Sequence, residues 1–80
     1  MKKQKLRQVV AEILEADPDS LRSETDLRAL TGFDSVNILS LMIALDEQAG
    51  IKLGPEEATT LQFFGEIEKL ALSQGVTLED

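Results

Sequence analysis

Apolar positions in the first sixteen residues recur at helical spacing. They follow the pattern i, i+3, i+4, i+7 and i+8, which places on one stripe Leu6, Val9, Val10, Ile13 and Leu14. This period predicts an amphipathic helix from about Lys3 to Ala16. The segment "DPDS" should end it, because Pro18 disfavours helical geometry at Asp17 and has no backbone N–H to donate.

Residues 17–33 form a long connection, and connections of this length need anchors or a function. Four apolar residues are candidate anchors that would hold the segment against the helices: Leu21, Leu27, Leu30 and Phe33. A helical turn is predicted near Glu24 to Leu30. Gly32 is expected to supply unusual backbone angles just before the next helix.

The second helix is predicted from Ser35 to Ala49. Gly50 follows it and favours the left-handed position that ends many helices. Pro55 can open a short third helix, since proline fits the first helical position. Glu56 and Glu57 would then lie in the first turn, where the helix dipole favours acids.

A fourth helix is predicted to begin at a cap formed by Thr59 or Thr60 and to end at Gly75. Its buried face would comprise Phe63, Phe64, Ile67, Leu70 and Ala71. The tail "VTLED" is expected to be loosely held. These elements predict an all-α fold, a small four-helix bundle of three main helices and one short one, with a long loop between the first two helices. Residues 1–80 are expected to form a single domain.

The second helix has apolar residues on two sides. One arc of about 100° holds the expected buried stripe, Ile38, Leu41, Met42, Leu45 and Ala49. The opposite side holds Val36, Ser40, Ile43 and Glu47. Three explanations of Val36 and Ile43 remain open. They are isolated surface residues without a function, they are covered by the long loop, or they form a docking face for a partner protein. In the docking interpretation, basic side chains of the partner meet Asp46, Glu47, Glu56 and Glu57.

Charge and composition reduce the range of functions that the chain could have. The net charge is −7, and everything after Arg7 carries four bases against fifteen acids, a net −11. Such a charge repels nucleic acids and anionic lipids and favours basic protein partners, although it also serves solubility alone. The chain has no cysteine and no histidine, so disulfides, thiolate metal sites and the usual general base are excluded.

No secretory signal or membrane span is predicted. The basic start "MKKQKLRQVV" lacks the apolar stretch of a signal peptide. The longest purely apolar run is "LMIAL", whereas a spanning helix requires about 20 residues. A monomer in the cytoplasm is expected.

Asp34 and Ser35 stand at the start of the second helix. Asp34 can act as N-cap, accepting hydrogen bonds from the N–H groups of Val36 and Asn37, which leaves the Ser35 hydroxyl free. A helix N-terminus tolerates a phosphate ester, so Ser35 suits phosphorylation or a larger phosphate-linked group. It does not suit nucleophilic catalysis, because the chain supplies no activating base. On these residues alone, a cap is the more common role of such a pair.

The residues around Ser35 resemble the acyl carrier protein family. In that family a small residue, an apolar residue, an acid, the modified serine and another apolar residue introduce the second helix, matched here by Gly32, Phe33, Asp34, Ser35 and Val36. The resemblance extends over about Leu6 to Leu72 and includes the long first loop, "ALDEQAGIKL" and "PEEA".

The resemblance implies a cofactor, 4′-phosphopantetheine, that a phosphopantetheinyl transferase moves from coenzyme A onto Ser35. Asp34 would be recognised by the transferase besides capping the helix. The protein would then be a carrier and not an enzyme, holding acyl groups as thioesters for acyl-loading and acyl-processing enzymes with basic docking patches. The alternatives are a non-catalytic helical adaptor with Ser35 as cap or phosphosite, and a stand-alone hydrolase, which the missing base disfavours.

The chain also departs from the family pattern. Carriers of primary fatty acid synthesis usually have acids near the start and middle of the second helix, where this chain has Asn37 and Ser40. This difference suggests a specialised lipid or secondary-metabolite pathway. Phe63 and Phe64 would either line a cargo cavity or belong to the ordinary core.

Overall fold

The computed structural model describes residues 1–79, and helices make up its regular structure. The elements, in chain order, are α1 (Lys3–Leu14), the 3₁₀ turns η1 (Pro18–Ser20) and η2 (Leu27–Ala29), α2 (Ser35–Ala44) with a π-helical continuation η3 (Leu45–Ala49), α3 (Pro55–Thr60) and α4 (Phe64–Ser73). The predicted all-α fold, with three main helices and one short one, is confirmed.

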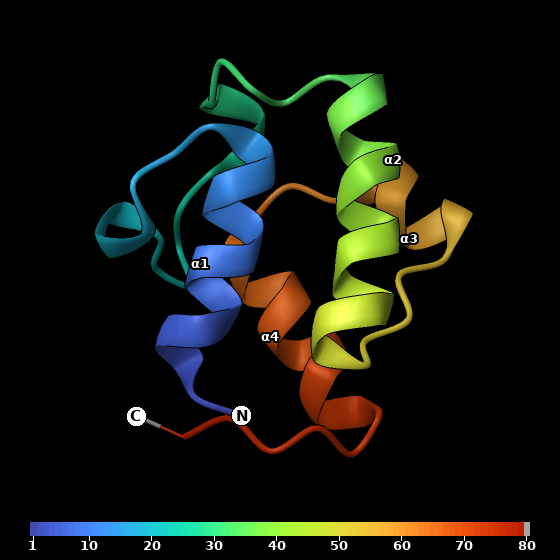
Figure 1. Ribbon diagram of the computed structural model, residues 1–80. Helices are drawn as coiled ribbons and strands as arrows, with labels where there is room; N and C mark the ends of the chain where they lie inside the picture. The colour runs from blue at the N-terminus through green and yellow to red at the C-terminus, as the bar shows by residue number, and fades with distance from the viewer. Residues whose placement is uncertain (80) are drawn as a thin grey trace.

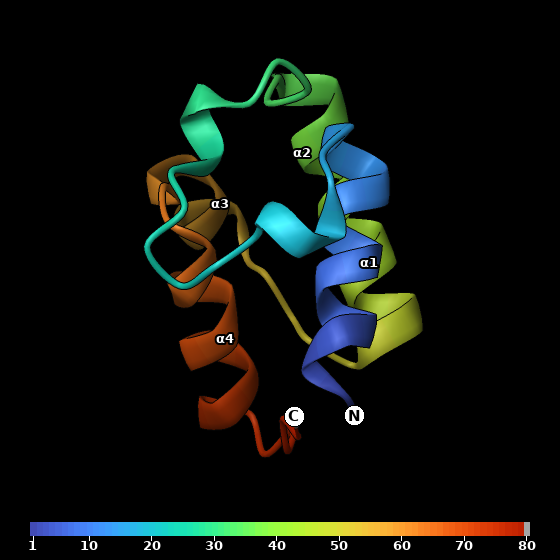
Figure 2. The same cartoon turned by 90° about the vertical axis from the view of Figure 1, so that its left-hand side faces the viewer.

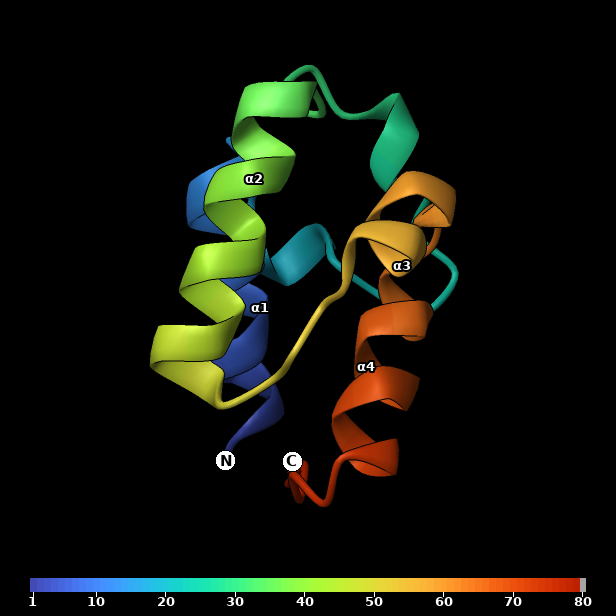
Figure 3. The same ribbon diagram turned by 90° about the vertical axis from the view of Figure 1, so that its right-hand side faces the viewer.

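The helices α1 and α2 lie side by side and run in opposite directions (Figure 1). The other views place α4 on the far side of the molecule from α2, with α3 above it (Figures 2 and 3). The long loop between α1 and α2, residues 15–34, closes the remaining side. The start of α2 lies at one end of the molecule, and the first and last described residues lie at the opposite end (Figure 1).

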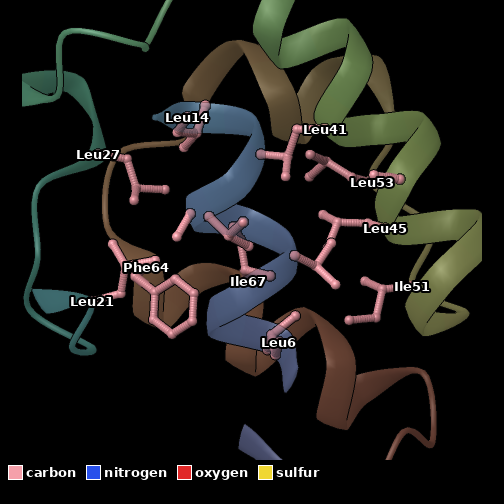
Figure 4. Close-up of a cluster of buried hydrophobic side chains, with 14 of the residues drawn as sticks. Leu6, Leu14, Leu21, Leu27, Leu41, Leu45, Ile51, Leu53, Phe64 and Ile67 are labelled. Atoms are coloured by element: carbon pink, nitrogen blue, oxygen red, sulfur yellow. The ribbon is translucent and has the colours of Figure 1, made fainter. Parts of the chain in front are cut away.

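One apolar core joins these elements. Leu6 and Leu14 of α1, Leu41 and Leu45 of α2 and η3, and Ile67 of α4 are fully buried and point toward one another (Figure 4). Burying an aliphatic side chain of this size stabilises the fold by about 1.5–3 kcal/mol. The buried stripes predicted for the first two helices therefore form the core, with Ile38, Met42 and Ala49 partly buried at its edge.

The long loop is held by side chains and by backbone. Leu21 and Leu27 are fully buried, and Leu30 and Phe33 pack partly buried against the core, as predicted. The backbone of the loop also runs beside the start of α4 and accepts hydrogen bonds from its first N–H groups: Phe64 N to Thr25 O (3.0 Å) and Gly65 N to Ser23 O (2.9 Å). These N–H groups have no acceptor within the helix, so the loop takes the role of a cap.

Two predicted helix ends are wrong. The first helix ends at Leu14 and not at Ala16, because Glu15 takes a left-handed conformation (φ 57°) and Ala16 N donates back to Ala11 O (2.9 Å). Thr59 and Thr60 do not cap α4. They belong to α3, where the Thr59 hydroxyl donates to the carbonyl oxygen of Pro55 (2.7 Å).

The start of α4 is organised by a glutamate instead. The Glu66 carboxylate accepts a hydrogen bond from Phe63 N (2.7 Å), the residue before the helix. Phe63 is 41% exposed, so its predicted place on the buried face is wrong, whereas Phe64 is buried. Phe64 is thus an ordinary core residue.

Two of the predicted stop signals are confirmed, and the loose tail is not for residues 76–79; its last residue, Asp80, lies outside the described residues. Gly50 and Gly75 both have positive φ, at 66° and 83°. After Gly75, Val76 and Leu78 pack against the core. The backbone of Glu79 pairs with the first residues of the chain, through Lys3 N to Glu79 O (2.6 Å) and Glu79 N to Met1 O (2.9 Å). Within residues 1–79, no helix is long and apolar enough to cross a membrane.

Candidate functional site

Ser35 is the first residue of α2, and Asp34 is the N-cap that fixes this start. The Asp34 carboxylate accepts a hydrogen bond from Asn37 N (2.7 Å), and the Asp34 carbonyl accepts one from Ile38 N (2.9 Å). The cap was expected to bind Val36 N as well, but only the bond from Asn37 forms. The cap therefore occupies the acid and leaves the serine outside the capping network.

The side chain of Ser35 is exposed, and no residue in the described part of the chain forms a hydrogen bond with it. A hydroxyl on the first turn of a helix lies at the positive end of the helix dipole. The site thus presents a primary hydroxyl from a rigid position, without competition from internal acceptors. This arrangement suits a covalently attached phosphate-linked group.

Position 32 needs a glycine because a side chain would not fit there, and not because of the backbone angles. The expectation of an unusual conformation is wrong, since only Gly50 and Gly75 among the described glycines have positive φ. A Cβ atom on Gly32 would lie 2.1 Å from the backbone oxygen of Leu14. Asn37 holds the same stretch from the other side, because its side-chain amide donates to Gly32 O (2.8 Å). The glycine brings the loop against the end of α1 and so places the start of α2.

A hollow of about 450 Å³ opens beside Ser35, referred to below as the Ser35 hollow. Its walls come from the long loop, the first turn of α2, and α3: Arg28, Phe33, Asp34, Ser35, Ile38, Ala58 and Thr59. Elements far apart in the sequence therefore meet next to the hydroxyl. A phosphate-linked group on Ser35 would have room to lie along the protein as well as to extend into solvent.

Beyond Ser35, α2 carries an exposed apolar stripe formed by Val36, Leu39 and Ile43. These side chains are 71%, 58% and 54% exposed, and none of them is covered by the long loop. Leu39 was missed by the sequence reasoning, which placed Ser40 on this side, whereas Ser40 is half-buried. The spacing Val36 to Leu39 to Ile43, i, i+3 and i+7, was the signal that pointed to it.

The acids predicted to flank this stripe differ in availability. Asp46 already forms an ion pair with Lys52, whose Nζ lies 2.7 Å from its carboxylate. Glu47, Glu56 and Glu57 are exposed, and the Glu57 carboxylate accepts a hydrogen bond from Gly54 N (3.2 Å) at the start of α3. Negative charge therefore lies at the far end of the stripe and on α3. The first two turns of α2 after Asp34 carry none.

The contribution of the Asp34 cap to stability can be measured. Changing Asp34 to alanine removes the acceptor for Asn37 N, and we expect a loss of about 1 kcal/mol in the free energy of unfolding, a typical value for an N-cap. Urea unfolding followed by circular dichroism measures it. Asp34→Asn, which keeps an acceptor oxygen, should lose less. Equal stability of Asp34→Ala and the unchanged protein would contradict the capping role.

Known proteins match most of this chain. Residues 4–71 match the family described as "Phosphopantetheine attachment site". The chain is 34% identical over 58 residues to an acyl carrier protein of Treponema denticola, covering 72% of this chain and 74% of that protein. It is 29% identical over 62 residues to one of Wolinella succinogenes (78% and 82% covered). It is 28% identical over 69 residues to one of Saccharopolyspora erythraea (86% and 73% covered).

Proposed function

Because the chain belongs to the acyl carrier protein family, whose members carry a covalently attached 4′-phosphopantetheine, we propose that Ser35 bears this group. Carrier proteins of this kind are not catalysts but present bound acyl groups to enzymes. When attached, the arm supplies a terminal thiol that holds an acyl group as a thioester. The absence of cysteine from the chain is consistent with a thiol supplied by the cofactor.

The observation that carries the proposal is the exposed Ser35 hydroxyl, which has no partner in residues 1–79. In the attachment step, Ser35 Oγ forms a bond to the phosphorus of the phosphopantetheine half of coenzyme A. The phosphoanhydride bond to 3′,5′-adenosine diphosphate breaks, and that diphosphate leaves. We assign the hydroxyl proton to a base of the transferase, since this chain has no histidine and the Asp34 carboxylate is engaged by Asn37 N.

The direct test is a loading reaction. The purified protein is incubated with coenzyme A, magnesium and a phosphopantetheinyl transferase of broad specificity, and its intact mass is measured. We expect the mass to rise by one phosphopantetheine. A folded protein that gains no mass would overturn the proposal and leave the adaptor function, in which Ser35 is a cap or a phosphosite.

The exposed apolar stripe is the proposed contact surface for partner enzymes, the transferase included. Val36 and Ile43 were predicted for this role, and Leu39 joins them. At the rim, basic residues of a partner would meet Glu47, Glu56 and Glu57, with Asp46 less available because of its ion pair with Lys52. Asn37 and Ser40 in place of acids support a specialised lipid or secondary-metabolite pathway for the carrier.

The role proposed for the stripe can be tested by replacing Val36. Val36→Ser should lower kcat/KM of the transferase for this protein about tenfold. In the complex the partner would bury Val36, and losing a valine buried at a contact surface costs about 1.5 kcal/mol. Steady-state loading rates measured against protein concentration provide the value. The folded state should be unaffected, because Val36 is 71% exposed.

Leu72→Ser is the matched control. Leu72 is 59% exposed on α4, away from Ser35, so its replacement removes a comparable surface residue without touching the stripe. It should load at the rate of the unchanged protein. An equal loss in both variants would show that general surface hydrophobicity, and not contact along α2, controls loading.

A further inference from the structure

Arg28 is a cation held in a fixed orientation at the edge of the Ser35 hollow. Its Nε donates to the carbonyl oxygen of Leu61 (2.8 Å), and its Nη2 donates to that of Thr59 (2.9 Å). The guanidinium carbon lies 5.7 Å from the centre of the Phe33 ring. These contacts tie the turn η2 to the end of α3, and the two elements lie next to each other in both side views (Figures 2 and 3).

The guanidinium retains unused donors. An arginine side chain has five N–H groups, and the two carbonyl contacts use two of them. No carboxylate among residues 1–79 forms an ion pair with Arg28. This is unexpected in a chain with fifteen acids and eight bases, where Lys52 is paired with Asp46 at 2.7 Å. The charge of Arg28 is thus available to another anion.

The position of Arg28 indicates which anion that is. Arg28 and Ser35 line the same hollow, and Arg28 is the only basic residue among those that do. A phosphodiester on Ser35 would place one negative charge at this hollow, in a domain whose net charge is already −7. Guanidinium groups bind phosphate oxygens through paired N–H donors, and the carbonyls of Thr59 and Leu61 hold this one in place beforehand.

We infer that Arg28 is a binding residue for the phosphodiester that joins the arm to Ser35, and that it holds the first part of the arm against the hollow. This inference rests on the proposed function. It differs from a purely structural role, in which Arg28 only fastens η2 to the end of α3. A structural role stabilises the unloaded and loaded proteins equally, whereas phosphodiester binding stabilises only the loaded one.

A thermodynamic cycle separates the two roles. The melting temperature is measured for the unloaded and loaded forms of the unchanged protein, Arg28→Gln, Arg28→Lys and the control Arg22→Gln. Arg22 lies in the same loop but does not line the hollow. We expect loading to raise the melting temperature of the unchanged protein by about 3 °C. At the 4–8 °C per kcal/mol typical of a domain of this size, this rise corresponds to a stabilisation of less than about 1 kcal/mol.

The rise on loading should disappear in Arg28→Gln, remain in part in Arg28→Lys and remain in full in Arg22→Gln. It should also shrink in 1 M sodium chloride, because salt screens an exposed charge pair. A second readout is the ¹⁵N–¹H resonance of Arg28 Nε, which should shift between the unloaded and loaded forms. This resonance reports on the contact even if Arg28→Gln is less stable.

Two results would overturn the inference. One is an equal rise of the melting temperature on loading in Arg28→Gln and in the unchanged protein. Arg28 would then have only the structural role of linking η2 to the end of α3. The other is no rise on loading and no shift of the Nε resonance in the unchanged protein. Intact mass confirms loading in every sample, so a failure to attach the arm at all counts against the proposed function and is distinguished from both results.

Discussion

Ser35→Ala is expected to abolish attachment of the arm, so that intact mass shows no gain after incubation with coenzyme A, magnesium and the transferase. The change removes one oxygen atom, the proposed nucleophile. Nothing else should change, because the Ser35 side chain is exposed and forms no hydrogen bond within residues 1–79. Alanine also favours a helix more than serine by a few tenths of a kcal/mol. The melting temperature should therefore be equal or slightly higher.

Ser40→Ala provides the control on the same helix. Ser40 is half-buried and lies outside the set of residues that line the Ser35 hollow. This variant should gain the mass of one phosphopantetheine, as the unchanged protein does. If Ser35→Ala still gains mass, another side chain bears the arm. In that event Ser35 would be a residue of the helix start alone.

Gly32→Ala is expected to have the largest effect on stability. The new Cβ would lie 2.1 Å from the backbone oxygen of Leu14 and 2.5 Å from its carbonyl carbon. Backbone atoms in a packed helix end cannot move aside as a flexible side chain does, so the loop must separate from α1. We expect a loss of about 3 kcal/mol or more in the free energy of unfolding, at the upper end for overpacking. Urea unfolding measures this loss.

Gly50→Ala distinguishes crowding from backbone conformation. Gly50 has φ 66°, but nothing lies within 4 Å of the position where a Cβ would be added. The cost should be about 1 kcal/mol, the strain of a left-handed conformation for an L-residue. If both variants lose the same free energy, crowding against Leu14 is not what requires a glycine at position 32.

Local spacing predicted the parts of this fold that depend on neighbours in the sequence. The buried stripes of α1 and α2 follow the helical period, and Gly50 and Gly75 end their helices as expected of glycine. The four anchors of the long loop are apolar residues in a polar segment, which is a local signal as well. At the site, the cap by Asp34 followed from residue type and position alone.

The features that were wrong or missed depend on distant contacts. Thr59 and Thr60 are good caps by type, but the loop backbone at Ser23 and Thr25 satisfies the start of α4 instead. Gly32 is needed because Leu14, eighteen positions earlier, passes close to it. Likewise, nothing in the sequence near Arg28 indicates the carbonyls of Thr59 and Leu61 that orient it. Such contacts appear only once the chain is folded.

The backbone pairing of residues 1–3 with residue 79 has a practical consequence for handling the protein. Both segments of this pairing lie at the end of the molecule opposite the start of α2 (Figure 1). A resin, sensor chip or fluorophore coupled near either extremity would therefore leave the Ser35 hydroxyl facing bulk liquid. Immobilised protein should be loaded by the transferase as readily as protein free in solution.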